Sequence, residues 1–189
     1  LSVREVAKKG TVLVGFHEKR SSFIADMKSC EILPKRVSDL LVPLRELINS
    51  LSLRKKLPQI ELAVTDEALA LVLRVLEKPT ADDEAKLRQF QKDYGVDFWY
   101  QPKGPDSIYP MDPENAARLK LHHRETGVEV VFRPTDFTQV NHRLNEVMVT
   151  RALRLLHLEP SSKVIDFFCG LGNFTLPLAT RTAQVLGIE

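Results

Sequence analysis

Short apolar runs separated by turn residues dominate the first two thirds of the chain, and they predict a sheet built from hairpins. Residues 1–7 and 11–16 alternate around Lys8-Lys9-Gly10, which indicates a hairpin with basic residues at its tip. The same reasoning predicts strands over residues 22–27, 57–65, 68–76, 96–100, 118–123 and 128–132. The aromatic run over residues 98–100 is expected to pack in the core, although such rings can also stack on bases.

Three segments show a helical pattern instead. Pro43 interrupts an apolar series, so a helix is expected to begin at Pro43, because a first-turn proline is tolerated. Thr80 is the predicted N-cap of a helix whose charges run from acidic to basic and which Gly95 ends. Asn141 can cap a third helix, whose expected apolar face is Leu144, Val147, Met148, Ala152 and Leu155.

The pattern changes near the end of the chain. An apolar run over residues 163–168 leads into a turn with Gly170 and Gly172, then a helical pattern, and then a second apolar run that closes on Glu189. Strand, loop, helix and strand in this order predict the opening half of a nucleotide-binding α/β unit. Glycines there allow a tight turn and a close approach of the backbone to a ligand, beside the N–H groups at the start of the following helix.

The spacing of this loop differs from that of a dinucleotide site. The dinucleotide fingerprint is G-x-G-x-x-G/A, and here Thr175 stands at the last position. Asp166 before the turn and Glu189 after the second strand suit an adenosyl cofactor without a pyrophosphate, so S-adenosylmethionine is the best candidate. The alternative is an ordinary strand–turn–helix with a structural glycine pair.

Composition places the chain among soluble globular proteins. Its 189 residues are 43% hydrophobic and 28% charged, which leaves room for one large or two small domains. No apolar run approaches the roughly 20 residues that span a bilayer, and Leu1 opens on a predicted strand rather than a signal peptide. Two distant cysteines make no disulfide framework, so a reducing, cytoplasmic location is expected, with no membrane partner.

Charge is unevenly distributed, although the net charge is only +2. Residues 1–56 carry 12 Lys and Arg against 6 Asp and Glu, which makes this part the candidate nucleic-acid face. Basic side chains at the tips and edges of the predicted sheet can reach phosphates, namely Lys8, Lys9, Lys19, Arg20 and Lys28. The alternatives are a solvated surface and edge lysines that prevent strand pairing between molecules.

Two single residues have chemistry that the pattern alone does not assign. Cys30 lies in a predicted loop where its neighbours supply no second metal ligand, and a lone cysteine is usually a small buried hydrophobe. Gln139 precedes the helix capped by Asn141, so its amide either reaches a ligand or serves as a second N-cap.

Two segments together resemble one known family, the uracil-C5 RNA methyltransferases. The segments are Asp136-Phe137-Thr138-Gln139-Val140-Asn141 and the stretch from Asp166 to Ala179, which contains Phe168-Cys169-Gly170-Leu171-Gly172-Asn173-Phe174-Thr175. The similarity is greatest to the members that make 5-methyluridine in 23S ribosomal RNA. It also continues upstream, more weakly, to the start of the chain.

This resemblance implies a fold and a cofactor. It implies an α/β protein, with an RNA-facing α+β domain over residues 1–133 and the first part of a Rossmann-like methyltransferase domain over residues 134–189. The family binds S-adenosylmethionine through residues that match Gln139, Phe168, Asn173 and Glu189. Its ribosomal members also hold a 4Fe-4S cluster, of which Cys30 matches one ligand, although Glu31 stands where the family has proline.

The resemblance also implies that this chain is an internal part of a longer enzyme. The family adds a cysteine thiolate to C6 of uracil, and the resulting enolate attacks the methyl sulfonium before a base removes the C5 proton. Neither Cys30 nor Cys169 matches that nucleophile, so no catalytic residue is expected here and the chain alone should be inactive. Ribosomal RNA is the expected partner, and DNA is not. The alternatives are a transfer-RNA methyltransferase, which lacks the cluster, and a non-catalytic RNA-binding module.

Overall fold

The structure, a computed structural model, describes residues 1–6 and 10–189, and its internal contacts divide the chain into two units. The first unit is Leu1–Ala117 and the second is Arg118–Glu189. Our expected boundary after residue 133 differs from this division by about one hairpin, because residues 118–132 pack within the second unit. The turn of this hairpin contacts the helix that follows it in sequence, which explains why the contacts group the two together.

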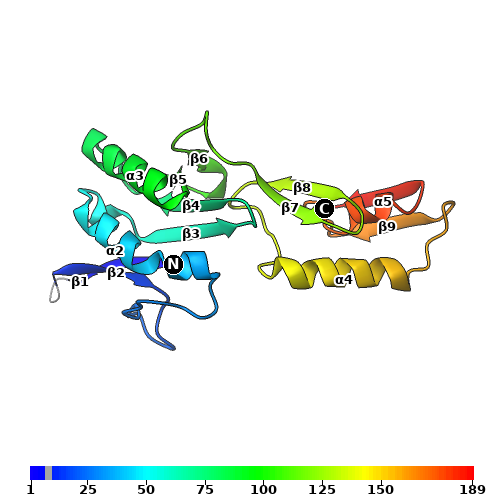
Figure 1. Cartoon of the computed structure of the whole chain (residues 1–189), viewed down its shortest axis with the longest axis horizontal. Coiled ribbons are helices and arrows are strands. Elements are labelled where there is room, and N and C mark those ends of the chain that lie inside the picture. Colours follow the sequence, from blue (N-terminus) through cyan, green and yellow to red (C-terminus); the bar gives the residue numbers. More distant parts are fainter. Residues whose placement is uncertain (7–9) are drawn as a thin grey trace. The chain divides into compact units, whose positions relative to one another are not determined.

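A six-stranded mixed sheet forms the first unit, in the order β2-β1-β3-β4-β5-β6 (Figure 1). Neighbouring strands are antiparallel except β4 and β5, which run parallel because a helix crosses over between them. The strands are β1 (Ser2–Val6), β2 (Thr11–Gly15), β3 (Gln59–Val64), β4 (Leu69–Arg74), β5 (Asp97–Gln101) and β6 (Tyr109–Pro110). The two predicted hairpins are therefore confirmed, although Lys8 and Lys9 at the first tip lie outside the described residues.

The helices of this unit are α1 (Lys35–Ser38), α2 (Leu41–Ser50) and α3 (Ala81–Tyr94), with short 3-10 turns at Arg54–Lys56 and Pro105–Ser107. Helix α2 begins two residues before the predicted start, so Pro43 is its third residue. The proline is tolerated there because the N–H groups of the first turn have no partner within the helix. Pro43 therefore does not mark the first residue of the helix, as we predicted, but lies within its first turn.

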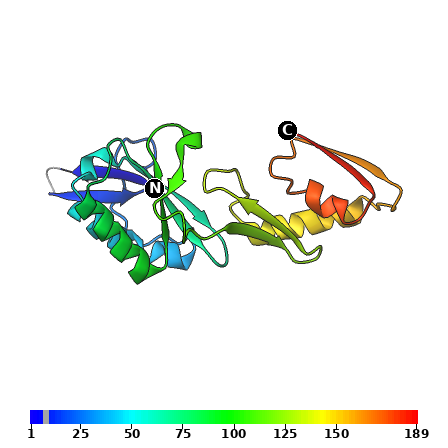
Figure 2. The ribbon, with the colours of Figure 1, turned by 90° about the horizontal axis from the view of Figure 1, so that it is seen from above.

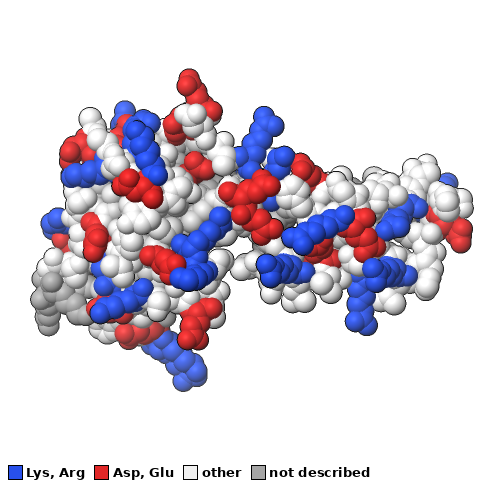
Figure 3. Space-filling model, viewed as in Figure 1, with Lys and Arg blue, Asp and Glu red and all other residues white. Residues whose placement is uncertain are grey.

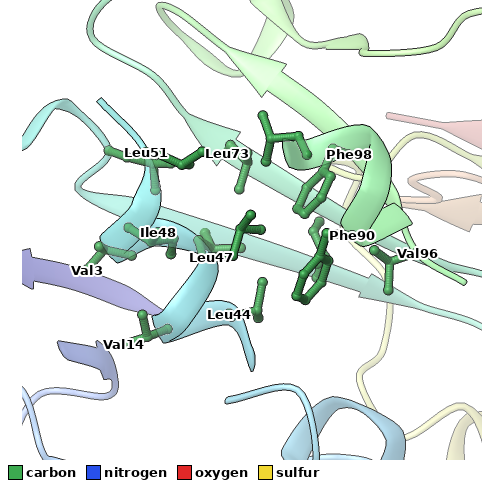
Figure 4. Close-up of a cluster of buried hydrophobic side chains, with 14 of the residues drawn as sticks. Val3, Val14, Leu44, Leu47, Ile48, Leu51, Leu73, Phe90, Val96 and Phe98 are labelled. Atoms are coloured by element: carbon green, nitrogen blue, oxygen red, sulfur yellow. The ribbon is translucent and has the colours of Figure 1, made fainter. Parts of the chain in front are cut away.

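The core of the first unit lies between the sheet and the helices α2 and α3 (Figure 4). Leu44 and Ile48 of α2 meet Leu73 of β4, Phe98 of β5 and Phe90 of α3, and each of these is buried. Full burial of one such side chain stabilises a fold by about 1.5–3 kcal/mol. Of the aromatic run on β5, Phe98 and Tyr100 are in this core, which confirms core packing as their role.

Residues 22–27 do not form the third strand that we predicted. A single antiparallel bridge joins His17 to Ile24, and it is flanked by only two backbone hydrogen bonds. Local turn hydrogen bonds compete with a longer ladder, because Ser21 Oγ accepts from the Phe23 N–H and the Met27 N–H bonds back to the Ala25 carbonyl. The segment is therefore a turn-rich loop that lies beside the sheet, where the Ser22 carbonyl accepts a hydrogen bond from Arg4 of β1.

The second unit consists of an antiparallel hairpin, a parallel strand pair and two helices (Figure 2). Its elements are β7 (Leu119–His123), β8 (Val128–Phe132), α4 (His142–Leu155), β9 (Lys163–Phe167), α5 (Thr175–Ala179) and β10 (Gln184–Ile188). Asn141 caps α4 by accepting from the Leu144 N–H at 3.0 Å, as predicted. The strand–loop–helix–strand order of the predicted cofactor unit is also confirmed.

Helix α4 buries a different face from the one that we predicted. Val149 and Leu153 are its buried residues, and they pack with Leu178 of α5, Val164 of β9 and Val185 of β10. Four of the five residues of the predicted face are exposed, by 41–65%: Leu144, Val147, Met148 and Leu155. The helix carries two apolar stripes, and the described elements of this unit cover only the stripe that contains Val149 and Leu153. The prediction therefore chose the wrong stripe.

The strand pair itself is covered on one side. Val164 and Val185 face the helices, whereas the alternate residues Ile165, Phe167, Leu186 and Ile188 are 41–63% exposed. Because side chains alternate across a strand, these four occupy the opposite face. Parallel strands ordinarily have both faces covered, whereas the described residues cover only one face of this pair.

The start of helix α3 is held by several hydrogen bonds to one buried carboxylate. Thr80 and Asp83 form a capping box, in which the Asp83 N–H donates to Thr80 Oγ1 and the Thr80 N–H donates to Asp83 Oδ2. The same carboxylate accepts from the backbone N–H and the hydroxyl of Ser52 at 2.7 and 2.6 Å. Asp83 is fully buried, so it fastens the loop after α2 to the start of α3.

Replacing Asp83 by alanine should destabilise the first unit by about 1.5–3 kcal/mol, since it removes the carboxylate of the capping box, which accepts hydrogen bonds from both Ser52 and Thr80. Urea unfolding followed through Trp99, the single tryptophan, measures this loss. The exposed Asp82→Ala is the control, because its carboxylate pairs only with Lys86 at the surface. Equal stability of the two variants would contradict this role for Asp83.

The contribution of Asp83 should also depend on pH. Burial raises the pKa of this carboxyl, but hydrogen bonds from Ser52 and Thr80 outweigh burial and lower the pKa below its ordinary value of 3.8. A group whose pKa is lower in the folded state stabilises the fold above the ordinary pKa, and this stabilisation is lost as the pH falls through the folded value. The stability gap between wild type and Asp83→Ala should therefore be full at neutral pH and shrink below pH 3.8.

Candidate cofactor site

The predicted cofactor loop connects the end of β9 to the start of α5. Its backbone has positive φ at three alternate positions, Phe168 at 61°, Gly170 at 54° and Gly172 at 87°. Glycine adopts this conformation without cost, whereas a bulky side chain such as that of Phe168 is strained there by about 1–2 kcal/mol. The Phe168 ring is also 92% exposed. A strained and exposed aromatic residue beside a pocket is a feature typical of ligand sites.

Helix α5 does not offer the row of unpaired N–H groups that we expected at its start. It has only five residues, and the N–H groups of Leu176 and Leu178 already donate to the carbonyls of Gly172 and Phe174. The loop therefore closes on itself through backbone hydrogen bonds. Side chains, rather than the helix end, supply most of the polar groups of this site.

Gly187 on β10 makes the packing beneath the loop possible. A Cβ atom at Gly187 would lie 2.9 Å from Cys169 Sγ and 3.1 Å from Thr175 Oγ1, so no other residue fits without a shift. Thr175 in turn donates to Asp166 Oδ2 at 2.6 Å, and this hydrogen bond fixes the carboxylate at the end of β9. Cys169 thus packs against the backbone of the neighbouring strand, in keeping with a packing role rather than a nucleophilic one.

Glu189 joins the end of β10 to the loop. Its Oε2 atom accepts from the Gly170 N–H at 2.6 Å, and the Cys169 N–H donates to the Ile188 carbonyl at 3.1 Å. A carboxylate that accepts from a backbone N–H forms one of the stronger kinds of hydrogen bond. The acid that we predicted as a ribose ligand is thereby held beside the glycine loop.

Asn173 pairs with a residue that sequence reasoning did not select. Asn145 Nδ2 donates to Asn173 Oδ1 at 2.7 Å, and Asn173 Nδ2 donates to Asn145 Oδ1 at 2.9 Å. Asn145 lies on α4, 28 residues earlier in the chain. The two amides form a reciprocal pair between the helix and the loop.

One pocket of about 160 Å³ collects most of the predicted site residues. Gln139, Phe168 and Asn173 line it together with Asp166, whereas Glu189 lies beside it and bonds to Gly170, which is in the lining. The pocket is contained within the second unit. The structure therefore brings the four predicted cofactor residues to one region, three of them in the pocket wall.

The hairpin contributes two residues that sequence reasoning missed. Leu121 of β7 and Val130 of β8 are directly opposite each other in the strand register, and both line the pocket. The expected boundary after residue 133 places this hairpin in the first domain, away from the predicted site. Strand alternation does place both residues on one face, and this was the available signal.

The junction before α4 is also fixed by specific contacts. Asp136 accepts from the backbone N–H, Nε and Nη2 of Arg133, at 2.7, 3.1 and 3.1 Å. This clamp shapes the turn that leads to Gln139. Phe137 and Thr138, which lie between Asp136 and Gln139 in sequence, also line the pocket, and Phe137 is 83% exposed.

Cys30 lies in the first unit as a half-buried free thiol. Its backbone N–H donates to Ser38 Oγ at 2.7 Å, which holds the loop against α1. Within residues 1–6 and 10–189, no three His, Cys, Asp or Glu side chains are grouped so that they could hold a metal ion. The described residues thus present a single cysteine at this position, whereas iron–sulfur clusters are ordinarily held by four.

Much of the positive charge of the first third is paired locally. Arg45 pairs with Asp26 at 2.8 Å, and Arg54 and Lys55 both pair with Glu5. On the face shown in Figure 3, basic and acidic side chains are interspersed over this unit. A net basic composition therefore does not translate into a uniformly basic surface on this face. Lys19 and Arg20 remain exposed in the loop after β2.

Within the part of the chain that the structure describes, no helix is both long and apolar enough to cross a membrane. The longest helices, α3 and α4, have 14 residues each and carry charged side chains along their length.

Comparison with known proteins identifies relatives over the whole chain. The chain is 57% identical to the 23S rRNA (uracil(1939)-C(5))-methyltransferase RlmD of Ralstonia pickettii. The 189 aligned residues are 100% of this chain and 42% of the relative. The proteins of the same name from Cupriavidus necator and Burkholderia lata are 58% and 59% identical, again over the full chain, and 43% and 40% of their lengths are covered. The chain thus spans about two fifths of the length of these relatives.

The sequence profile of one family, described as tRNA (Uracil-5-)-methyltransferase, matches residues 16–189. This match includes the junction with Gln139, the glycine loop and Glu189, which are the residues that the structure gathers around the pocket. The chain belongs to the tRNA (uracil-5-)-methyltransferase family.

Proposed function

We propose that a full-length protein containing this chain transfers a methyl group from S-adenosylmethionine to C5 of a uracil in 23S ribosomal RNA. The observation that carries the proposal is the pocket in the second unit, where Gln139, Phe168 and Asn173 meet and Glu189 is bonded to the glycine loop. These are the positions that resemble the cofactor residues of the family. The relatives match this chain over its whole length and are named for 23S ribosomal RNA, which supports the ribosomal substrate.

The proposed cofactor suits the chemistry of the pocket. Its adenosine part can lie against apolar residues such as Leu121 and Phe174, while the exposed Phe168 offers a ring face for contact. The carboxylate of Glu189 accepts hydrogen bonds from ribose hydroxyls, as acids at the end of the second strand do in related folds. Its hydrogen bond to the Gly170 N–H holds it in place for this role.

The methyl transfer itself needs groups that this chain does not supply. Carbon-5 of uracil is a poor nucleophile until a thiolate adds to C6, and the resulting enolate then attacks the methyl group of the sulfonium. A base afterwards removes the C5 proton, and the thiolate leaves as the C5–C6 double bond re-forms. Cys169 packs under the cofactor loop and Cys30 is in the other unit, so we assign neither as the nucleophile.

The alternative functions are less well supported. A non-catalytic RNA-binding module has no need for a pocket that gathers the cofactor positions of a methyltransferase. A transfer-RNA substrate agrees with the description of the family, but relatives at 57–59% identity are named for 23S ribosomal RNA. Methylation assays of the full-length protein with each RNA distinguish the two substrates.

Replacing Glu189 by alanine in the full-length protein should weaken S-adenosylmethionine binding about tenfold or more, because a charged hydrogen bond is worth about 1.5–3 kcal/mol. Titration calorimetry measures the dissociation constant. Glu159→Ala is the matched control, since this exposed acid precedes β9 at the opposite end of the strand from the loop. An unchanged dissociation constant for Glu189→Ala would remove Glu189 from the site.

The chain of residues 1–189 alone should transfer no methyl groups above background, because no described residue fills the roles of nucleophile and base. Incubation with ribosomal RNA and cofactor labelled in the methyl group measures this transfer. The full-length protein is the positive control. Turnover by the chain that Cys169→Ser abolishes would show that Cys169 is the nucleophile after all.

We also propose that Cys30 ligates a 4Fe-4S cluster in the full-length protein, as the resemblance implies. Two observations support this proposal. Cys30 is a half-buried free cysteine, and a hydrogen bond to Ser38 anchors its loop. Such clusters are held by four thiolates, so three ligands would come from outside this chain. When bound, the cluster would tie this loop to those segments.

Anaerobically purified full-length protein should accordingly contain about four irons per molecule and absorb visible light. Cys30→Ala should lower the iron content, whereas Cys169→Ala should leave it unchanged, because Cys169 lies in the other unit. Iron quantification and absorption spectra measure both. A Cys30→Ala protein with the iron content of the wild type would contradict the assignment and leave Cys30 as an ordinary loop cysteine.

A further inference from the structure

We infer that Asn145 is a positioning residue for the cofactor, which acts by holding the side chain of Asn173 in one orientation at the pocket. This inference rests on the proposed function, because it takes S-adenosylmethionine as the ligand of the pocket. Asn145 itself is outside the pocket lining, whereas Asn173 is part of it.

The amide pair constrains Asn173 more tightly than a single hydrogen bond would. Each side chain donates one N–H and accepts one, over 2.7 and 2.9 Å, so rotation of either amide breaks both bonds at once. A carboxamide has two N–H donors and two acceptor lone pairs, so Asn173 keeps one donor and one lone pair for a ligand. The pair therefore leaves the binding capacity of Asn173 intact and fixes its direction.

Asn145 is placed to do this because it lies on the buried stripe of α4. Val149 and Leu153 follow it at intervals of four residues and pack against α5 and the strand pair. Asn145 continues this stripe toward the loop as a half-buried polar residue. A polar side chain on such a stripe needs a partner, since an unpaired buried amide destabilises a fold.

The helix that carries Asn145 is fixed independently of the amide pair. The Arg124 N–H donates to Glu146 Oε1 at 2.8 Å, and Thr150 Oγ1 lies 3.4 Å from Nε2 of the buried His123. Glu125 pairs with both Arg154 of α4 and Arg181 after α5. These contacts tie α4 to the turn of the hairpin. The helix therefore sets the orientation of the Asn145 side chain, and the two hydrogen bonds between the amides then fix the orientation of Asn173.

The loop needs such a support at Asn173. Gly172 immediately before it has a φ of 87°, and Phe168 and Gly170 also have positive φ, a conformation that is costly for the phenylalanine. The amide pair connects this irregular backbone to a regular helix. Without it, Asn173 would sample several side-chain orientations, and the cofactor would have to select one of them on binding.

A double-mutant cycle in the full-length protein tests the inference. Asn145→Ala should weaken S-adenosylmethionine binding about three- to tenfold, the range expected for losing a supporting hydrogen bond. Asn173→Ala should weaken binding at least as much. The double variant should then bind no more weakly than Asn173→Ala, because Asn145 acts through Asn173. The KM for RNA should stay unchanged in Asn145→Ala.

Leu153→Ala is the control for a merely structural role, because it loosens the same helix face without touching the amide pair. A loss of cofactor affinity in Leu153→Ala equal to that in Asn145→Ala would overturn the inference. So would an unchanged affinity in Asn145→Ala, or effects of the two asparagines that simply add. If Asn145→Ala fails to fold, Asn145→Asp replaces it in the cycle, since this variant keeps the size and the acceptor but loses the donor to Asn173.

The same cycle separates this inference from the proposed function. An unchanged affinity for S-adenosylmethionine in Asn173→Ala would remove Asn173 from the cofactor site, and the inference would fail with it. A weakened Asn173→Ala together with a normal Asn145→Ala would instead leave the proposed site in place and overturn the positioning role alone.

Discussion

The parallel pairing of β9 and β10 is the constraint on which the candidate site depends. It brings Glu189 next to Gly170, 19 residues earlier, and it places Gly187 opposite Asp166. Because Gly187 has no side chain, Cys169 and Thr175 can pack against the strand, and Thr175 can reach Asp166. The positive φ values of the loop are thus held from one side by the neighbouring strand. The amide pair of Asn145 and Asn173 also connects the loop to helix α4.

Features that depend on neighbouring residues in sequence were predictable. The start and end of α3 follow from Thr80, Asp83 and Gly95, whose capping chemistry is local and does not depend on the rest of the fold. The hairpins of the first unit were predictable for the same reason, since alternation and turn residues are visible along the chain. The glycine loop was recognisable from its residues, and the resemblance to a family added Gln139 and Phe168 as proposed cofactor residues, both of which line the pocket.

Features that depend on long-range packing were not predictable. Helix α4 has two apolar stripes, and the one that contains Val149 is buried because Leu178, Val164 and Val185 meet it there. Only the fold decides between the stripes. The loop over residues 22–27 failed as a strand because Ser21 and Ala25 provide local hydrogen-bond partners that alternation does not reveal. Leu121, Val130 and Asn145 reach the site from other elements, so their contribution becomes visible only in three dimensions.

The uncovered face of the strand pair links folding to ligand binding at the candidate site. Ile165 and Phe167 on β9 lie beside Leu186 and Ile188 on β10, and all four expose apolar surface that a complete α/β layer would bury. The carboxyl ends of the same two strands carry Asp166 and Glu189. Whatever covers this face will stabilise the strands, and with them the geometry of the loop. By the reciprocity of linked equilibria, a ligand that favours the ordered loop also favours the covered sheet. Binding of the proposed cofactor and burial of this face should therefore favour each other without any direct contact between the two surfaces.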